Sequence, residues 1–373
     1  MARILIVTQS NETGLTYHRQ TVPHKHFTRN YEGYDVDITY DISEATKEEL
    51  GQYQIVSFLR LVDHEGKTEQ ILEKCKQAGC KTVIDIDDYW NLHPSHELSP
   101  AYKKHNIPQQ TIDGLKNCDW VTTTTEHFAD KIREFNKNVT VLPNSIDEAE
   151  MQFKPAPTYS NRLRFGWIGG VYHSQDIAML QNGIKDVWRS CNHKAFQLCL
   201  GGYNKNRAYD YLETIFTDNY KYPKDLGYQK YLKTFLPLNN HVMDSEPYKR
   251  LWGKDVREYA GMYNDIDVAL IPLVETAFNS YKSQIKIIEA GWFKKAAIVS
   301  NVMPYTIDCN RNNSILISPS KRGEGWGPAI KSLILDPNKA KDKAEALHEL
   351  VKEKYSMDKT NIIRDQLYKR LCE

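Results

Sequence analysis

One strand–loop–helix segment of the sequence carries polar residues at a spacing suited to binding a diphosphate group. A buried strand is predicted over Ile266–Pro272, a polar, exposed loop, Glu275–Tyr281, follows it, and Ser283 can cap the helix after the loop. A helix start offers free N–H groups and the positive end of the helix dipole, which attract phosphate. Lys282 and Lys286 can neutralise phosphate charge, and Glu289 could accept both hydroxyls of a ribose. The alternative is a capped surface helix with an ordinary Lys/Glu face.

A glycine pair ends another predicted strand, within the segment 165–176. Gly169 and Gly170 let the backbone approach a ligand closely, and a helix is predicted to begin near Ser174. His173 stands beside the pair and is a candidate for contact with that ligand. The G-x-G-x-x-G spacing of a dinucleotide site is absent, so a nucleotide-linked dehydrogenase is a distant alternative.

Asp85 lies in the fourth predicted strand, and Asp87 and Asp88 follow that strand directly. Asp87 and Asp88 are candidates to contact a ligand at the end of this strand. The alternatives are a capping or buried hydrogen-bonding role, a metal-binding Asp-x-Asp pair, or a phosphatase-like nucleophile. The same Asp-x-Asp spacing recurs at 265–267, which shows how easily it arises, and the other parts of a phosphoryl-transfer site are missing.

The loop after the first strand offers further candidates. Tyr17, His18 and Arg19 are candidates to contact a ligand, although Arg19 could equally be a solvated helix residue. His127 begins a helix after the fifth strand, where a helix-start role is favoured over catalysis.

Elements that could position these residues alternate along the whole chain. Continuous apolar runs suit the strands of a parallel sheet covered on both faces. In the first domain, predicted over 1–150, the strands are Ile4–Thr8, Asp35–Thr39, Ile55–Leu59, Thr82–Ile86, Trp120–Thr123 and Val139–Leu142. In the second domain, predicted over 151–355, they are Leu163–Ile168, Phe196–Leu200, Ile266–Pro272, Ala296–Ser300 and Ser314–Ile317. The fold class is therefore α/β, with two doubly wound Rossmann-like domains facing a cleft, where ligands of such sheets bind.

A tyrosine-rich segment, 203–250, reads as an insertion in the second domain. Its aromatic and cationic residues could stack bases and hold phosphates, which would suit a nucleic acid. Acidic residues dilute that charge, so a packed tyrosine-rich lobe is favoured.

Composition excludes several classes of protein. The 373 residues include 49 Lys+Arg and 48 Asp+Glu, so the net charge of +1 gives no broad field for nucleic acid or an anionic membrane. The apolar runs fall far short of the roughly 18 residues of a membrane span. Seven scattered cysteines fit a reducing cytosol, which predicts a cytoplasmic protein. Cys75 and Cys80 lie five apart, and no second pair has zinc-ligand spacing. No metal site is predicted.

The segment 267–300 resembles the donor-binding region of GT-B glycosyltransferases of the retaining, glycogen-synthase-like group. The residues 278–289 match a subgroup pattern, Phe-Asn-x-x-Lys-Ser-x-x-Lys-x-x-Glu. Many members carry two glutamates separated by seven residues here, and this chain has Tyr281 in place of the first. The segments 83–90, 141–147 and 165–176 resemble the same group in order and spacing.

The resemblance implies metal-independent transfer of a sugar from a nucleotide diphosphate sugar, UDP- or GDP-linked, to a hydroxyl acceptor with retention of anomeric configuration. The acceptor could be a glycan, a lipid-linked sugar or a protein, and no cofactor is expected. The closing helix, 356–373, would pack back on the first domain. Donor binding is assigned to Gly169, Gly170, His173, Asn279, Ser283, Lys286 and Glu289, and the candidate catalytic residues are Glu275, Lys282, Asp87 and Asp88. Asp87 or Asp88 would contact the sugar or the acceptor, and acceptor binding is assigned to Tyr17, His18 and Arg19.

Two alternative functions remain at this stage. The missing first glutamate is compatible with a catalytically silent subunit that binds a sugar nucleotide or a glycan. A sugar transferase directed at nucleic acid is a narrower variant of the enzyme hypothesis. Whether Glu275 replaces the missing glutamate is an open question of the sequence.

Overall fold

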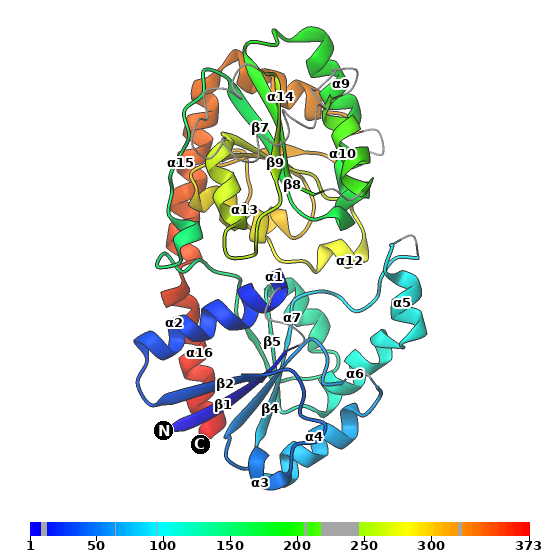
Figure 1. Ribbon diagram of the computed structural model, residues 1–373, viewed down its shortest axis with the longest axis vertical. Coiled ribbons are helices and arrows are strands. Elements are labelled where there is room, and N and C mark those ends of the chain that lie inside the picture. Colours follow the sequence, from blue (N-terminus) through cyan, green and yellow to red (C-terminus); the bar gives the residue numbers. More distant parts are fainter. Residues whose placement is uncertain (9–12, 64, 95, 205–206, 218–245, 320–322) are drawn as a thin grey trace. The chain divides into compact units, whose positions relative to one another are not determined.

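The computed structural model describes residues 1–8, 13–63, 65–94, 96–204, 207–217, 246–319 and 323–373 (Figure 1). The chain forms two compact units, and each is described by itself. The first comprises Met1–Asp147, Thr276–Ile285 and Tyr355–Glu373, and the second comprises Glu148–Glu275 and Lys286–Lys354. The segment Thr276–Ile285, which the sequence places in the second domain, is therefore counted with the first.

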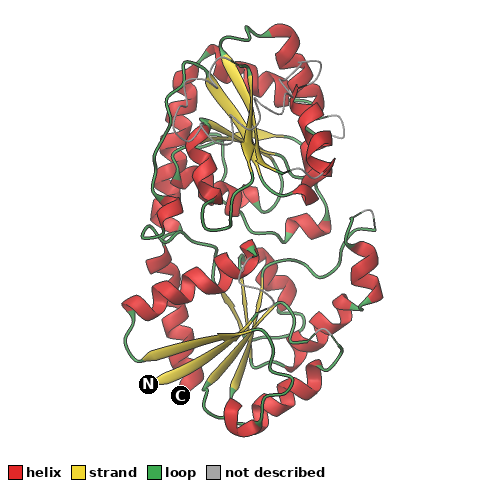
Figure 2. Ribbon diagram, viewed as in Figure 1, coloured by secondary structure: helices red, strands yellow, loops and turns green. Residues whose placement is uncertain are grey.

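A six-stranded parallel sheet forms the centre of the first unit (Figure 2). Its strands are β1 (Ala2–Val7), β2 (Tyr34–Thr39), β3 (Ile55–Leu59), β4 (Lys81–Ile86), β5 (Trp120–Thr123) and β6 (Val139–Val141). They are arranged in the order β2-β1-β3-β4-β5-β6. The order reverses between β1 and β3, so the polypeptide winds outward in both directions from that point.

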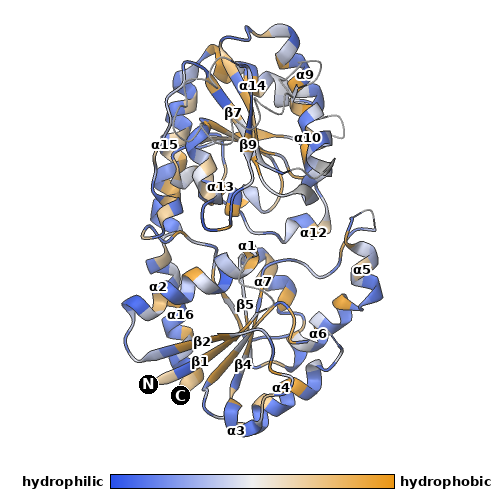
Figure 3. Cartoon of the chain, viewed as in Figure 1, coloured by the Kyte–Doolittle hydropathy of each residue, from blue (hydrophilic) through white to orange (hydrophobic). Residues whose placement is uncertain are grey.

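Alternate residues of β1 enter different cores, as the period of two in a strand requires. Ile4 and Ile6 pack on one face with Leu367 of the C-terminal helix. Leu5 and Val7 pack on the other face. Because both faces of the sheet are covered, its inner strands, such as β3, are hydrophobic along most of their length (Figure 3), which explains the apolar runs of the sequence.

Helices cover the sheet of the first unit. They are α1 (Gly14–Thr16), α2 (Val22–Asn30), α3 (Lys47–Leu50), α4 (Thr68–Gln77), α5 (Ser99–Lys104), α6 (Ile107–Asn117), α7 (Glu126–Ile132), α12 (Ala277–Ser280) and α16 (Met357–Cys372), and a π-helical turn, Tyr17–Thr21, joins α1 to α2. The helix α16 packs on α2, where the Tyr368 hydroxyl and His24 Nε2 are 2.7 Å apart and Asn361 donates to the Pro23 carbonyl.

The second unit contains a parallel sheet of the same size. Its strands are β7 (Leu163–Ile168), β8 (Phe196–Tyr203), β9 (Tyr248–Trp252), β10 (Val268–Ile271), β11 (Ala296–Ser300) and β12 (Ile315–Ile317). The order β12-β11-β10-β7-β8-β9 reverses between β7 and β10. The helices are α8 (Ser174–Ala178), α9 (Gln181–Ser190), α10 (Arg207–Thr217), α13 (Ile285–Trp292), α14 (Trp326–Leu335) and α15 (Pro337–Lys354).

Part of the segment predicted as an insertion belongs to this sheet. The helix α10 packs on β8, and β9 is the strand beside β8 at the edge of the sheet. The side chains of Glu213 and Arg250 form a buried ion pair that joins α10 to β9. These residues are a regular β–α–β continuation of the sheet, and 218–245 lie outside the described residues.

Each sheet has one position at which the strand order reverses. In the first unit this point lies between β1 and β3, and in the second it lies between β7 and β10. Open parallel sheets bind their ligands outside the strand ends at such points. The loops after these strands carry most of the candidate residues of the sequence.

Candidate active site

Lys286 lies directly over the end of β7 in the second unit. Its Nζ donates to the Ile168 carbonyl at 2.8 Å and lies 4.5 Å from the centroid of the Trp167 ring. A side chain on residue 169 would clash with Lys286 and Trp167, because a Cβ there would lie 2.6 Å from Lys286 Nζ and 2.7 Å from the Trp167 ring. Glycine is therefore required at 169 for this close packing. Gly170 differs, since a Cβ there would meet nothing within 4 Å and its φ of −89° is ordinary.

Glu289 lies less than one turn beyond Lys286 on α13, and it is fully buried. Its Oε2 accepts hydrogen bonds from the hydroxyls of Tyr259 and Tyr263, the latter at 3.2 Å. Burial raises the pKa of this carboxyl to about 7, against the opposing effects of the two tyrosines and of Lys286. A carboxyl that titrates near neutral pH at the switch point of a sheet is typical of functional sites.

The two tyrosines were missed by sequence reasoning. They lie four residues apart in a short 3-10 helix, Tyr259–Asp265, that precedes β10. Only the spacing of two aromatic hydroxyls before a buried strand could have indicated them. The structure shows Glu289 bound to the tyrosines, and the predicted contact with a ribose stays a prediction.

His173 is oriented by a carboxylate that the sequence did not single out. Its Nδ1 lies 2.8 Å from Asp176 Oδ2, and the other oxygen of Asp176 accepts from the Val274 backbone N–H at 2.8 Å. The His173 ring meets Trp167 edge-on at 6.1 Å between centroids. Asp176 therefore links the imidazole of His173 to the backbone after β10, and both His173 and Lys286 contact the ring of Trp167.

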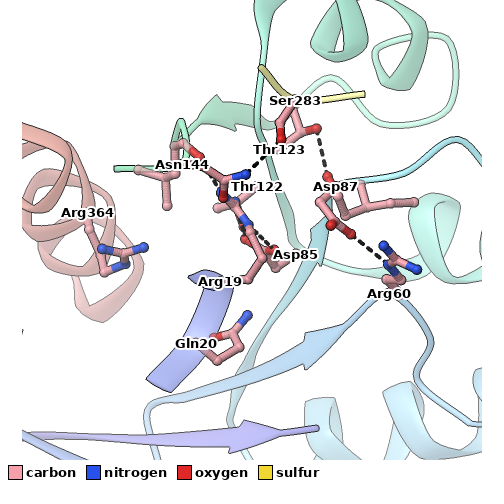
Figure 4. Close-up of polar contacts among 12 residues, drawn as sticks. Arg19, Gln20, Arg60, Asp85, Asp87, Thr122, Thr123, Asn144, Ser283 and Arg364 are labelled. Atoms are coloured by element: carbon pink, nitrogen blue, oxygen red, sulfur yellow. Dashed lines mark hydrogen bonds and ion pairs between the residues drawn. The ribbon is translucent and has the colours of Figure 1, made fainter. Parts of the chain in front are cut away.

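Arg19 is the centre of a buried network in the first unit (Figure 4). Its Nε and Nη2 donate to the two carboxylate oxygens of Asp85 at 2.8 and 2.7 Å, and Nη1 donates to the Leu142 carbonyl and to Asn144 Oδ1. Thr122 donates a further hydrogen bond to Asp85. Arg19 is 3% exposed. This placement differs from the predicted acceptor contact, because the guanidinium is directed into the protein.

The neighbours of Arg19 are also largely enclosed. Tyr17 is buried, and the ring of His18 meets it edge-on at 5.2 Å. Burial, with a smaller effect of the Arg19 charge, lowers the pKa of His18 to about 4, so this imidazole is neutral at physiological pH.

The hydrogen-bond network of Arg19 extends through Asn144 to Ser283. Asn144 donates from Nδ2 to the Ser283 hydroxyl at 2.8 Å (Figure 4). The prediction that Ser283 caps the following helix is wrong, because α13 begins at Ile285. The loop before it is not simply polar and exposed either, since it contains α12, which Thr276 caps and in which Asn279 is buried.

Two further polar residues of this segment, Lys282 and Glu275, have different surroundings. Lys282 Nζ lies 4.9 Å from the centroid of the Phe278 ring. Glu275 is exposed, and it is the last residue of the segment Glu148–Glu275 of the second unit.

Arg60 holds the two aspartates that follow β4. Its Nε donates to Asp87 at 2.6 Å, and its Nη2 pairs with Asp88. Burial and the neighbouring Asp88 charge raise the pKa of Asp87, although Arg60 opposes this. Arg60 itself has a φ of 65°, a left-handed conformation that costs energy in a residue with a side chain. Sequence reasoning missed Arg60, whose only signal is its place directly after a buried strand.

Tyr281 occupies the position at which many members of the resembled group carry a glutamate. Its ring stacks on His127 with centroids 4.8 Å apart and an angle of 14° between the planes. It also packs against Tyr89 at 4.8 Å and Phe128 at 5.3 Å. The departure from the group pattern therefore has a structural role, because the ring anchors the segment 276–285 within the first unit.

Within the described ranges, no group of three or more His, Cys, Asp or Glu residues could hold a metal ion. Among the same residues, no helix combines the length and apolar character needed to cross a bilayer.

Comparison with solved structures identifies the fold. A sucrose-phosphate synthase from Thermosynechococcus elongatus matches with a TM-score of 0.64 at 14% identity, over 100% of this chain and 99% of that one. A glycosyltransferase from Rickettsia africae matches with a TM-score of 0.61 at 12% identity, over 100% and 99%. The chain has the GT-B fold. The prediction of two doubly wound domains is thereby confirmed, with six parallel strands in each.

A further GT-B structure, HepE of Anabaena in complex with UDP and glucose, matches with a TM-score of 0.59 at 11% identity, over 100% of this chain and 99% of that one. No model of a known protein family matches the chain, and the comparison with curated protein sequences gives no match. At such low identities, the likeness to solved structures shows the fold.

Proposed function

We propose that this protein transfers a hexosyl group from a nucleotide diphosphate sugar to a hydroxyl acceptor, with retention of anomeric configuration and without a divalent metal ion. The observation that carries the proposal is the placement of Lys286 and the buried Glu289 on α13, at the switch point of the second sheet. The GT-B fold adds support, since neighbours of that fold include proteins solved with UDP and with UDP-glucose. Retention rests on the resemblance of 278–289 to the retaining group.

The chemistry requires the second unit to stabilise a leaving group. The bond between the anomeric carbon and the diphosphate oxygen breaks and leaves its electron pair on the diphosphate. The acceptor oxygen forms a new bond to that carbon, and the proton of the acceptor hydroxyl passes to the departing diphosphate. Negative charge grows on the departing diphosphate, and the ammonium group of Lys286 would stabilise it. The close packing at Gly169 and the orientation of His173 by Asp176 would fix the donor against β7.

Roles for the other candidates follow from their positions. Glu289 would bind the ribose, with its carboxylate orientated by Tyr259 and Tyr263. Asn279, Lys282 and Ser283 would contact the donor from the segment 276–285. Asp87, Asp88 and Glu275 remain proposed as the acidic groups near the reacting sugar.

Thermal unfolding of the full chain with UDP-, GDP-, ADP-, CDP- and TDP-sugars tests this proposal. Binding well above the dissociation constant should raise the melting temperature by several degrees for one nucleotide family, with no metal added. The shift should be lost in Lys286→Ala and Glu289→Gln. It should persist in Glu345→Gln, an exposed glutamate of α15. A flat response to every sugar nucleotide, or a response to NAD alone, contradicts the proposal.

Tyr281 favours a second candidate, a subunit that binds a sugar nucleotide without turning it over. The phenol stands where a glutamate is common in the resembled group, and it is engaged in ring packing. Turnover distinguishes the two functions. Release of nucleoside diphosphate in the presence of an acceptor supports the enzyme, whereas a thermal shift without any turnover supports the binding subunit.

The proposal also includes a location in the cell. We propose that the protein acts in the cytosol, in keeping with seven scattered cysteines and the balanced charge of the chain. Fractionation of cells with compartment markers tests this location.

A further inference from the structure

A cavity opens at the carboxyl ends of β3 and β4 in the first unit. Its volume is about 170 Å³, and its walls come from α1, the ends of β3 and β4, and the helices α5 and α6. At roughly 30 Å³ for each water molecule, the space corresponds to about six waters. That volume suits one six-membered ring with its substituents, whereas an extended chain would need a longer groove.

The walls of this cavity combine flat rings with aliphatic side chains. Tyr89, Trp90 and Tyr102 contribute the rings, and Ile86 and Ile107 contribute aliphatic groups. Trp90 is held rigidly, because its ring packs between Phe128 and Phe135 in the interior. Rigid aromatic faces bury the apolar face of a ring at little cost in side-chain entropy.

One carboxylate lies in the wall of this cavity. Asp88 lines the cavity, and its side chain is 27% exposed. Arg60, which also lines the cavity, pairs with Asp87 through Nε and with Asp88 through Nη2. Each aspartate thus has one charged partner that restrains its direction, and the carboxylate of Asp88 can still accept from hydroxyl groups.

The backbone at Arg60 supports a functional reason for this arrangement. Its φ of 65° is unfavourable for an arginine, and strained residues of this type concentrate at ligand-binding sites. The conformation turns the chain at the end of β3, where the Arg60 N–H donates to the Asp85 carbonyl at 2.8 Å. The strain thus accompanies the placement of the guanidinium beside both aspartates.

We propose that this cavity binds a pyranose ring of the acceptor, with its apolar face on Tyr89 and Tyr102 and a hydroxyl donating to Asp88. The inference rests on the proposed transferase function and names the acceptor class, a glycan. Each requirement of a pyranose has a counterpart in the cavity: a volume for one ring, aromatic faces for its C–H groups and one fixed carboxylate for its hydroxyls.

A neighbouring hollow of about 210 Å³ provides a matched comparison. It lies at the ends of β1 and β3 and is lined by Thr8, Tyr40 and three acidic residues, Asp41, Asp63 and Glu65. Tyr40 is 54% exposed there, and aromatic rings do not enclose the space on several sides. If a sugar bound in this second hollow, its affinity would fall when Tyr40 is replaced and would not change when Tyr102 is replaced.

Saturation-transfer NMR and calorimetry on the full chain test the proposal, with methyl gluco-, galacto- and mannopyranosides as probes and cyclohexanol as the ring without the hydroxyl pattern. We expect at least one pyranoside to bind more tightly than cyclohexanol. Tyr102→Ala and Asp88→Asn should each weaken its binding about ten- to a hundredfold, the effect of losing a ring face or a hydrogen bond to a charged group. Tyr40→Ala should bind as the wild type does.

Four results would overturn the proposal: no pyranoside binds, cyclohexanol binds equally well, both cavity variants bind as the wild type does, or Tyr40→Ala abolishes binding. If Tyr102→Ala is unfolded by circular dichroism, Tyr102→Leu keeps the apolar volume without the ring and decides the question. The thermal shift with nucleotide sugars, measured on the same wild-type sample, distinguishes failure of the acceptor proposal from failure of the transferase proposal. A donor shift without pyranoside binding contradicts only the acceptor class, whereas pyranoside binding without a donor shift contradicts the transferase.

Discussion

Breaking the ion pair between Arg19 and Asp85 should destabilise the first unit strongly. Both side chains are 3–4% exposed, and two hydrogen bonds of 2.7 and 2.8 Å join them. Removing one partner leaves the other charge buried without compensation, which typically costs about 3–5 kcal/mol. For a unit of this size, each kcal/mol lowers the melting temperature by about 2–4 °C, so Arg19→Met should lower it by roughly 6–20 °C.

The comparison that isolates burial uses an exposed ion pair of the same unit. Arg133 pairs with Asp130 at 2.6 Å on the surface of α7, with side-chain exposures of 36% and 76%. Arg133→Met should cost no more than about 1 kcal/mol, because surface pairs contribute little. A cycle of Arg19→Met, Asp85→Asn and the double variant should show that the double variant costs less than the sum of the two singles.

Urea unfolding followed by circular dichroism, with thermal unfolding alongside, measures these differences. If Arg19→Met costs as little as Arg133→Met, the buried network does not hold the ends of β1, β4 and β6 together, and the reasoning fails. An additive cycle would also refute it, because additivity would mean that the two charges do not depend on each other.

Three further predictions follow from the site geometry. The pKa of Glu289 is about 7 in the folded state against 4.5 ordinarily, so the folded state binds more protons between these values and the free energy of unfolding should fall by about 3 kcal/mol as pH rises from 4.5 to 7. Glu289→Gln should remove this slope in urea titrations at several pH values, and an unchanged slope would contradict the assignment. Gly169→Ala should cost about 1–3 kcal/mol in urea unfolding because its Cβ would overlap Trp167, whereas Gly170→Ala should cost less than about 0.5 kcal/mol, and equal costs would refute the packing argument. Tyr281→Ala should destabilise the protein by about 1–3 kcal/mol through loss of its ring contacts, whereas the exposed Tyr40→Ala should have little effect in the same denaturation assay; a neutral Tyr281→Ala would show that the ring does not anchor its segment.

The sequence alone determined most of the strands and their class of sheet. Ile55–Leu59 and Ala296–Ser300 were predicted with the bounds that the structure shows, because a mostly apolar run buried on both faces is a local signal. The strand β9 was missed because it belongs to a tyrosine-rich stretch with no comparable run. Motif order along the chain was sufficient for the GT-B fold, since each segment folds into its own strand–loop–helix unit.

Only the tertiary structure decided which polar groups meet. Arg19 and Asp85 are 66 residues apart, and Tyr259 and Glu289 are 30 apart, so no local pattern links them. The strand order brings these loops together at one edge of each sheet, and burial then decides their chemistry. Arg19 became an internal ion pair instead of a surface contact, and Glu289 acquired a pKa near neutrality, because the low-dielectric surroundings of a side chain depend on the packing of distant segments.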